Sequence, residues 1–362
     1  MVRKSIGIIG LKGLPAYGGA ATVGENIINQ LKDKYSFTVY STASHTDKKT
    51  GYYNGIQQIV FRKLPFKKIN SLYYYLISTF HSLFFGNYDL IHLHHRDAAF
   101  ITILLKLRYN VILTTHNSFY YWEKFKNIEW YLKLNEKYFV KKADIVTCVS
   151  EYESRQYKEL LNINAIFIPN GINISENLQL NGERNDDYLF FSAGRIIRSK
   201  GLDILLRAIK NIELNCKLLI AGDIEQTPKY KKEILTLSKN INVEFLGLIK
   251  NKNKLLEYIR NCKLFIYPSS YEAMSIMLLE AASQKVPIIC SDISPNSAVF
   301  NDDEVLFFKV NDVDDLGAKI KWALDNMPGM QAKIEKAYLK LKTKYQWKDI
   351  AKEYDKLFTK LM

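Results

Sequence analysis

The chain of 362 residues has few cysteines and prolines and no segment dominated by Gly, Pro or Ser repeats. Its four cysteines lie far apart and form no C-x-x-C pair, which argues against a disulfide framework and a thiolate zinc site. The N-terminus lacks the apolar length and the flanks of a signal peptide. We therefore expect a folded protein of the cytoplasm, where thiols stay reduced.

The composition, with 48% hydrophobic and 24% charged residues, is that of a globular protein. The length exceeds one ordinary core and suits two domains of roughly 150 to 200 residues each. Residues 1–172 hold 22 Lys and Arg against 12 Asp and Glu, and the remainder holds 29 against 25. The first half therefore carries most of the net charge of +14. This field attracts phosphorylated substrates or acidic lipids. We expect no nucleic-acid partner, because no nucleic-acid-binding motif accompanies the charge.

Short apolar runs rich in β-formers alternate with stretches of helical periodicity, which is the rhythm of parallel βαβ units. The pattern predicts an α/β protein of two Rossmann-like, doubly wound domains, over 1–172 and 188–345, joined by a polar linker over 173–187. Residues 346–362 are expected to form a helix that packs back on the first domain. The expected strands are 5–9, 37–41, 90–93, 111–114, 145–149, 165–168, 188–193, 217–221, 243–246, 264–267, 287–290 and 305–308. The expected helices include 22–32, 128–142 and 151–161.

The loop after the first expected strand is rich in glycine and ends at Gly18 and Gly19. In open α/β sheets ligands bind at the carboxyl ends of the strands. Glycines there let backbone amides approach an anion at the start of the next helix. The spacing of Gly7, Gly10 and Gly13 is not that of the dinucleotide fingerprint. The loop is a candidate phosphate site, and a plain glycine-rich turn is the alternative.

The corresponding loop of the second half carries Arg195 and Lys200 between a strand and an apolar helix. Two cations at a strand end suit a diphosphate, because a guanidinium binds as a fork and an ammonium as a point charge. A cluster of solvated charges is the alternative interpretation. The only close match to a metal-binding Asp-x-Asp pair, Asp312-Val313-Asp314, lies at the expected start of a late surface helix.

Two carboxylates eight residues apart, Glu272 and Glu280, follow the expected strand 264–267. A helix that starts near Ala273 would direct its free backbone amides at phosphates and place Glu280 roughly 12 Å further along its axis. Glu272 would then accept hydrogen bonds from a sugar and Glu280 from a ribose. The start of the helix comprises Met274, Ser275 and Ile276. A chance pair of glutamates is the alternative.

A series of short motifs runs in order along nearly the whole chain. They are Gly18-Gly19, His116, Pro169-Asn170-Gly171, Gly194-Arg195, Lys200-Gly201, Ala221-Gly222, Phe245-Leu246-Gly247, Pro268-Ser269 and Glu272 through Glu280-Ala281. In this combination the chain resembles the group 1 glycosyltransferases, also called glycosyltransferase family 4. The opening segment, from Ile6 to Gly19, is similar in particular to members that build bacterial surface polysaccharides, including rhamnosyltransferase-like ones.

The resemblance implies a GT-B fold, in which two Rossmann-like domains face each other across a cleft. It implies transfer with retention of anomeric configuration, without a metal ion or cofactor. The donor would be a nucleotide diphosphate sugar held by the second domain. The acceptor would be a saccharide or lipid-linked saccharide held by the first domain.

Roles carry over from the family to the matching positions. Gly18 and Gly19 would place amides on the donor phosphate, and His116 would contact the transferred sugar. Arg195 and Lys200 would neutralise the diphosphate. Glu272 would hold sugar hydroxyls, and Glu280 would hold the ribose. One departure is that family members usually have Glu-Gly-Phe-Gly where this chain has Glu272-Ala273-Met274-Ser275, so the loop lacks both glycines and their freedom in φ.

Two further segments have alternative interpretations. His92, His94 and His95 suggest a metal site, but histidines at a strand end more often contact substrate or water, and we expect no metal. A basic and aromatic stretch can lie on an anionic membrane, although a buried helix with a rim of lysines is equally compatible. It comprises Arg62, Lys63, Lys67, Lys68, 72–76 and 83–85.

Two rival functions stay open at this point. A nucleotide-sugar epimerase can share the architecture, but it would not release a nucleotide diphosphate in proportion to a glycosylated product. A non-catalytic scaffold for saccharide or membrane would not need His116, Arg195 and Glu280, which are all present.

Overall fold

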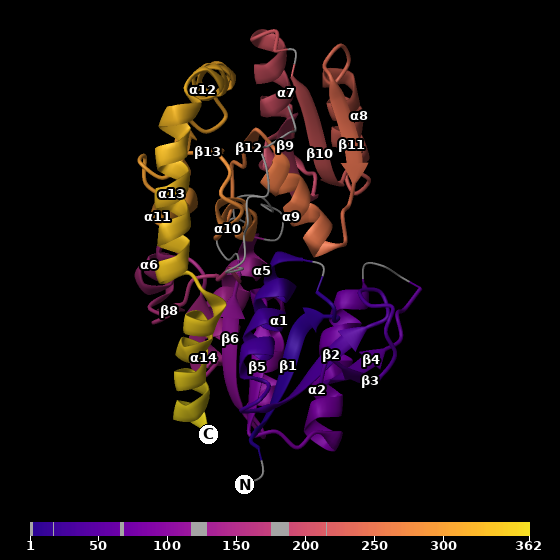
Figure 1. Ribbon diagram of the computed structural model, residues 1–362. Helices are drawn as coiled ribbons and strands as arrows, with labels where there is room; N and C mark the ends of the chain where they lie inside the picture. Colours follow the sequence, from indigo (N-terminus) through magenta and orange to yellow (C-terminus); the bar gives the residue numbers. More distant parts are fainter. Residues whose placement is uncertain (1–2, 17, 66–68, 117–128, 175–187, 215) are drawn as a thin grey trace. The chain divides into compact units, whose positions relative to one another are not determined.

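The computed structural model describes residues 3–16, 18–65, 69–116, 129–174, 188–214 and 216–362. The chain forms two compact units, and both appear in Figure 1. The first unit comprises Met1–Asn170 and Trp347–Met362, and the second comprises Gly171–Gln346. The predicted linker, 173–187, lies outside the described residues except for its first two positions.

Among the described residues, a sheet of eight strands forms the centre of the first unit, in the order β3-β4-β2-β1-β5-β6-β7-β8. Neighbouring strands are parallel except β3 and β4. The strands are β1 (Ser5–Lys12), β2 (Ser36–Thr42), β3 (Gly51–Tyr53), β4 (Ile56–Phe61), β5 (Leu90–His94), β6 (Asn110–Thr115), β7 (Ile145–Cys148) and β8 (Ile166–Phe167). Strand β5 is buried along its whole length, as expected for a central parallel strand covered on both faces.

Helices cover both faces of this sheet. Successive strand residues point to opposite faces, and β5 shows the consequence. Ile91 and Leu93 belong to the apolar cluster that α2 (Asn70–Phe85) and α3 (Thr102–Leu105) complete. His92, between them, contacts the rings of Tyr354 and Phe358 on α14 (Trp347–Leu361). Helix α14 packs beside α1 (Gly19–Leu31), as Figure 1 shows.

The C-terminal helix is tied to the first unit by polar contacts as well. Lys34 and Tyr35, which follow α1, bind the carboxylate of Asp355 on α14 at 2.7 and 2.6 Å. The other helices of this unit are α5 (Glu129–Leu134) and α6 (Glu151–Leu161), with a π-helical turn at Asn135–Phe139 and 3-10 turns at Arg96–Ile101 and Val140–Lys142.

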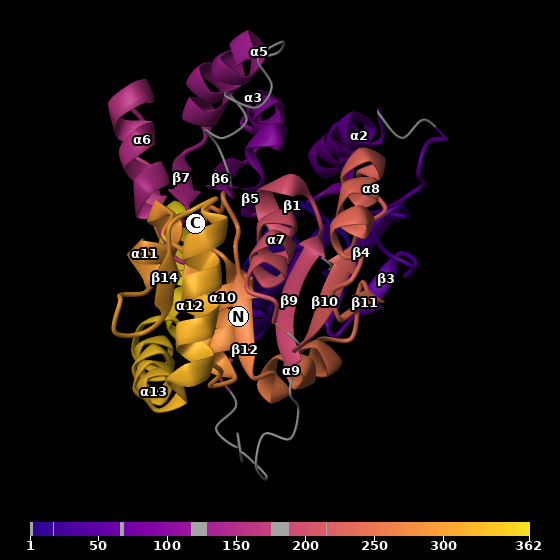
Figure 2. The same ribbon diagram turned by 90° about the horizontal axis from the view of Figure 1, so that it is seen from above.

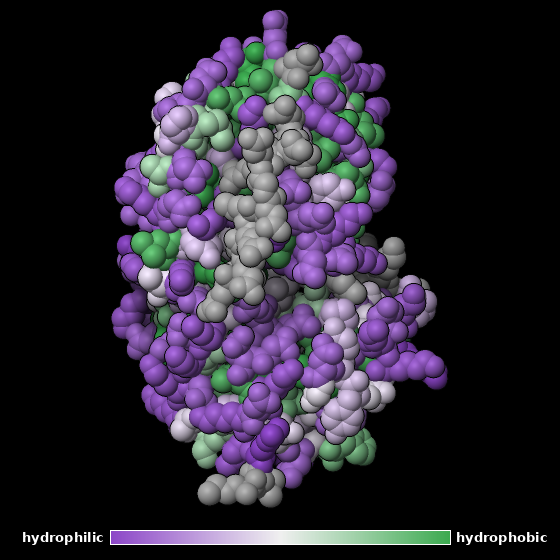
Figure 3. All heavy atoms as spheres, viewed as in Figure 1, coloured by the Kyte–Doolittle hydropathy of each residue, from purple (hydrophilic) through white to green (hydrophobic). Residues whose placement is uncertain are grey.

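Helix α2 is buried along one side and exposed at its end. Tyr74 and Tyr75 are buried in the core, whereas Phe84 and Phe85 are 72% and 80% exposed. A hydrophobic group appears in green at the lower right of Figure 3, where α2 ends in Figure 1. Within the described residues, no helix is long and apolar enough to cross a membrane.

The second unit contains, among the described residues, a parallel sheet of six strands in the order β11-β10-β9-β12-β13-β14. Helices α7, α8 and α12 contact one another in a row, and α9 and α13 contact α10. Figure 2 shows the two groups on opposite faces of the sheet. The strands are β9 (Tyr188–Arg195), β10 (Lys217–Asp223), β11 (Val243–Gly247), β12 (Leu264–Tyr267), β13 (Ile288–Ser291) and β14 (Leu306–Phe308). The helices are α7 (Leu202–Asn211), α8 (Pro228–Leu237), α9 (Lys252–Asn261), α10 (Ile276–Ser283), α11 (Ser294–Val299), α12 (Val313–Asp325) and α13 (Met327–Lys344).

These elements confirm the predicted α/β class, and each expected strand corresponds to one of them within a few residues. Two predictions need correction. The hairpin of β3 and β4 was not expected, although its turn is Asn54-Gly55, the dipeptide that such hairpins favour. The helix expected over 128–142 is broken into α5, a π-helical turn and a 3-10 turn. Helical periodicity does not distinguish these three windings.

Candidate active site

Three of the charged residues predicted in the second unit, Arg195, Lys200 and Glu272, lie where β9 and β12 end. Arg195 is the last residue of β9, and Lys200 closes the 3-10 turn that follows. Gly201 has a φ of 70°, and a Cβ at this position would lie 2.0 Å from the carbonyl oxygen of Pro268. Only glycine permits this approach. It brings the loop after β9 against the loop after β12, where Glu272 lies.

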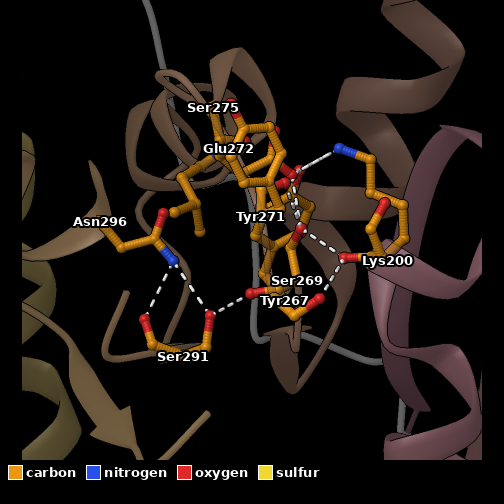
Figure 4. A network of polar contacts seen from close by, with 11 residues as sticks. Lys200, Tyr267, Ser269, Tyr271, Glu272, Ser275, Ser291 and Asn296 are labelled. Carbon is orange, nitrogen blue, oxygen red and sulfur yellow. Dashed lines mark hydrogen bonds and ion pairs between the residues drawn. The ribbon is translucent and has the colours of Figure 1, made fainter. Parts of the chain in front are cut away.

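The carboxylate of Glu272 is the centre of a polar network, shown in Figure 4. Its Oε1 accepts a hydrogen bond from the Tyr267 hydroxyl at 2.5 Å and pairs with the Lys200 ammonium at 2.5 Å. The Ser269 hydroxyl lies 2.7 Å from the same oxygen. Burial and the neighbouring charge of Glu272 raise the pKa of Tyr267 well above its ordinary value. Tyr267 therefore remains a hydrogen-bond donor.

The loop that carries Glu272 is held in place independently of Lys200. The Ser269 hydroxyl also lies 2.9 Å from the carbonyl oxygen of Ser199, and the backbone amide of Ser270 donates to that carbonyl at 2.9 Å. The Ser291 hydroxyl, at the end of β13, bonds the carbonyl of Ser269 (Figure 4). Asn296 of α11 bonds the carbonyl of Ser291 at 2.9 Å. Glu272 is thus positioned by β12, β13 and α11 together.

The helix predicted to start near Ala273 begins later. Helix α10 starts at Ile276, and Ser275 is its N-cap, with a hydroxyl that accepts from the amide of Leu278 at 3.3 Å. The missing family glycines are accommodated, because neither Ala273 nor Ser275 has a positive φ. Met274 is buried against the unit's interior. Glu272 therefore lies in the loop before the helix, and the predicted spacing of the two glutamates along one helix axis is wrong.

Glu280 lies in the interior of the second unit, 3% exposed. Its Oε1 pairs with the ammonium of Lys252, the first residue of α9. Its Oε2 is buried and has no hydrogen-bond partner among the described residues. Burial raises the pKa of Glu280, and the charge of Lys252 opposes that rise. A buried carboxylate oxygen without a donor is costly, by about 1 to 3 kcal/mol or more, and calls for an explanation.

The cations of this region differ in their pairing. Lys200 is neutralised by Glu272, with side chains 21% and 12% exposed. Arg195 is exposed and, within the described part of the chain, has neither an ion pair nor a side-chain hydrogen bond. It is therefore available to an incoming anion. The sequence predicted both cations but not their different states.

Two residues of this region were not given a role from the sequence: Tyr267 and Lys252. Tyr267 directly precedes the predicted motif Pro268-Ser269, so its position at the end of the strand was a signal. Lys252 offered none, because it is one of several lysines in a short polar stretch and 28 positions separate it from Glu280 (280 − 252).

Gly18, Gly19 and His116 belong to the first unit. Gly18 is the N-cap of α1 and Gly19 its first residue. A Cβ on either glycine would meet nothing within 4 Å. No described atom therefore crowds these two residues on the side where a Cβ would lie. The first turn of α1 carries no acidic residue and no side-chain cap, which leaves its positive end uncompensated.

His116 follows β6 and is 9% exposed. Its Nε2 lies 3.2 Å from Nδ1 of the buried His94. Burial lowers the pKa of both rings well below the ordinary value, and neighbouring histidines lower it further. Both rings are therefore neutral near pH 7, so one nitrogen donates and the other accepts. His92 bonds Thr114 at 2.7 Å instead, and burial lowers its pKa to about 3. Within the described residues, no group of three or more His, Cys, Asp or Glu side chains is arranged to hold a metal ion.

Known proteins match both units. Residues 17–176 match the family model described as Glycosyltransferase Family 4, and residues 173–340 match that of glycosyl transferases group 1. An uncharacterised glycosyltransferase of Methanocaldococcus jannaschii is 28% identical over 326 residues, which cover 86% of each chain. The N-acetylgalactosamine-N,N'-diacetylbacillosaminyl-diphospho-undecaprenol 4-alpha-N-acetylgalactosaminyltransferase of Campylobacter jejuni is 29% identical over 177 residues, 47% of this chain and 44% of that protein.

The fold also matches solved structures. HepE of Anabaena, in its complex with UDP and glucose, superposes with a TM-score of 0.78 over 99% of this chain and 100% of that one, at 16% identity. At that identity the likeness shows the fold alone. Together, the two family models cover the chain from residue 17 to residue 340, in the order expected for a GT-B protein. The chain therefore belongs to the group 1 glycosyltransferases, glycosyltransferase family 4, and is a glycosyltransferase.

Proposed function

We propose that this protein transfers a sugar, with retention of configuration, from a nucleoside diphosphate sugar to a saccharide or lipid-linked saccharide during the assembly of a bacterial surface polysaccharide. The Anabaena neighbour was solved with UDP and glucose. The Campylobacter relative is named for a substrate that is linked to diphospho-undecaprenol. A nucleoside diphosphate sugar as donor and a diphosphate-linked acceptor are both anionic, which agrees with the net positive charge of this chain.

The observation that carries the proposal is Oε2 of Glu280, which is buried and accepts no hydrogen bond from any residue that the structure describes. A buried acceptor of this kind is satisfied by a ligand that brings a hydroxyl or amide donor. A ribose brings two adjacent hydroxyls. Two cations that suit a diphosphate, Arg195 and Lys200, lie at and just after the end of β9. These residues form a consistent donor site. Glu280 would bind the ribose, the two cations and the start of α10 would bind the phosphates, and Glu272 would bind the sugar.

The chemistry then depends on the charge of the leaving group. Negative charge builds on the diphosphate as the sugar departs, and cations already in place stabilise it without reorganisation. We assign that task to Arg195 and Lys200, with no divalent metal. Asp312, the start of the only Asp-x-Asp match, accepts from the amides of Asp314 and Asp315 as the N-cap of α12. Its carboxylate is therefore already engaged in capping.

Retention without a side-chain nucleophile fits attack on the face from which the diphosphate leaves. In this mechanism an oxygen of the departing diphosphate accepts the proton of the acceptor hydroxyl, the new glycosidic bond forms, and the nucleoside diphosphate is released. The protein contributes position and charge stabilisation. In the first unit, Gly18 and Gly19 would add backbone amides to a phosphate, and His116 would donate or accept one hydrogen bond with the sugar.

A lipid-linked acceptor places the enzyme at a membrane surface, and α2 offers a contact site. Besides Phe84 and Phe85, Phe80 of this helix is 50% exposed. Arg108 bonds the carbonyl of Leu83, which brings a basic turn beside the end of α2. Exposed aromatic side chains next to basic ones favour the surface of an anionic bilayer. The predicted Lys67 and Lys68 lie outside the described residues.

The test combines ligand screening with a single substitution. Purified protein would be screened for thermal stabilisation by nucleoside diphosphates and their sugars, since a ligand at 100 times its Kd adds about 2.7 kcal/mol. Glu280→Ala should weaken the best nucleotide by about 1 to 3 kcal/mol. Release of nucleoside diphosphate in step with a glycosylated product distinguishes transfer from epimerisation. Unchanged nucleotide affinity in Glu280→Ala would remove Glu280 from the site.

A further inference from the structure

The ion pair between Lys252 and Glu280 joins an exposed side chain to a buried one. The side chain of Lys252 is 49% exposed, whereas that of Glu280 is 4% exposed. Lys252 belongs to α9, whose N-cap, Asn251, accepts from the amide of Lys254 at 3.1 Å. The cap fixes the start of the helix, and with it the backbone position of Lys252. The ammonium thus reaches Glu280 from the solvent side, and the two oxygens of the carboxylate have different surroundings.

Among the residues that the structure describes, Lys252 is the one charged side chain that acts on Glu280. Helix α10 packs against α9 and α13. Lys252 of α9 favours the charged form of Glu280, and no charged side chain of α13 acts on it. On the side of β12, the titratable neighbour is Tyr267, whose pKa the charge of Glu280 raises. Without Lys252, burial would be unopposed in favouring the protonated acid.

We propose that Lys252 is a positioning residue of the nucleotide site: its ammonium holds Oε1 and keeps Glu280 ionised, so that the free Oε2 accepts a hydrogen bond from a ribose hydroxyl. The inference rests on the proposed role of Glu280 and adds a residue that motif and spacing did not reveal. A protonated Glu280 would compete with the ribose by presenting its own donor. Lys252 therefore sets the pH range over which the nucleotide binds.

The experiment measures nucleotide affinity against pH in the full-length protein. The probe is the tightest binder among UDP, GDP, ADP and CDP, titrated calorimetrically from pH 5.5 to 8.5 into wild type, Lys252→Met, Lys252→Arg and Lys321→Met. Lys321 is an exposed lysine of α12 and controls for the loss of one surface charge. Titration of the nucleotide phosphate is common to all variants and cancels in the ratio of Kd values.

We expect the Kd of Lys252→Met, divided by that of wild type, to grow as the pH falls. Its limit is about tenfold for each unit by which the substitution raises the pKa of Glu280. Lys252→Arg should restore the wild-type profile, and Lys321→Met should match it. A loss of affinity that is equal at every pH would overturn the inference, because it would mean that Lys252 contacts the nucleotide directly. No loss at any pH would also overturn it.

A Glu280→Gln variant separates this inference from the proposed function. The amide cannot titrate in this range, so Lys252→Met in the Glu280→Gln background should add no pH-dependent change. If Glu280→Gln binds the nucleotide as tightly as wild type, the donor site itself is wrong. If Glu280→Gln weakens binding but Lys252→Met leaves the pH profile in place, only the role of Lys252 fails.

Discussion

Replacing Lys200 with Ala tests the charge mechanism most directly, and the structure predicts a different effect on each measurable quantity. In the free protein Lys200 already has a counter-ion, Glu272, at 2.5 Å. Binding the diphosphate exchanges one ion pair for another, so the substitution should change donor affinity little. The charge on the diphosphate is greatest in the transition state. We therefore expect the loss to appear in kcat, by roughly 100-fold or about 2.7 kcal/mol, as for a removed charge-stabilising donor.

The second unit should still fold after the same substitution. Glu272 keeps the hydrogen bond from Tyr267 at 2.5 Å and the neighbouring Ser269 at 2.7 Å, so its carboxylate is not left without donors. Because the two side chains are only 21% and 12% exposed, the loss of the pair should lower the free energy of unfolding by about 1 to 3 kcal/mol. This separates a catalytic defect from a folding defect, which urea denaturation would detect.

The assay follows release of nucleoside diphosphate, with donor affinity measured separately by calorimetry. Lys210→Ala, an exposed lysine of α7 in the same unit, is the matched control and should behave as wild type. Arg195→Ala should lose turnover as Lys200→Ala does, and activity should survive excess chelator. Near-normal turnover in the double variant would refute the reasoning, as would activity that chelator abolishes and manganese restores.

Three further predictions follow from other parts of the structure. Gly201→Ala should destabilise the second unit strongly, because its Cβ would lie 2.0 Å from a carbonyl oxygen. The Cβ of Gly194→Ala would meet nothing within 4 Å, so this variant is the control, and thermal unfolding of the two variants measures the difference. The double variant Phe84→Ser, Phe85→Ser should bind anionic vesicles less than wild type does, and salt should weaken wild-type binding. Equal binding of the wild-type protein to anionic and neutral vesicles would count against a membrane site. Because the pKa values of His92, His94 and His116 are lowered in the folded protein, the unfolded state binds more protons, and the free energy of unfolding should fall as the pH drops below about 6.5. Urea denaturation should show a smaller fall in His92→Asn than in wild type. An identical fall in that variant would contradict the assignment.

Sequence patterns predict the positions of the polar side chains in the candidate site but not how these side chains pair. The alternation of apolar runs locates β9 and β12, and with them the positions of Arg195, Lys200 and Glu272 at strand ends, because parallel strands bring their carboxyl ends to one edge. It does not say that Lys200 pairs with Glu272 while Arg195 has no ion pair with any described residue. That choice depends on the approach of two loops 72 residues apart, which the positive φ of Gly201 permits.

The sequence by itself thus determined the class of fold, the order of the strands along the chain and the family to which the chain belongs, since local periodicity and short motifs encode these. Tertiary structure decided which side chains are charged and which polar atoms have a hydrogen-bond partner. Lys252 reaches Glu280 from another helix, and His94 orients His116 from another strand. The physical reason is that burial and partners reached through space, rather than residue type, set whether a carboxylate is ionised, an imidazole neutral or an oxygen free to accept a ligand.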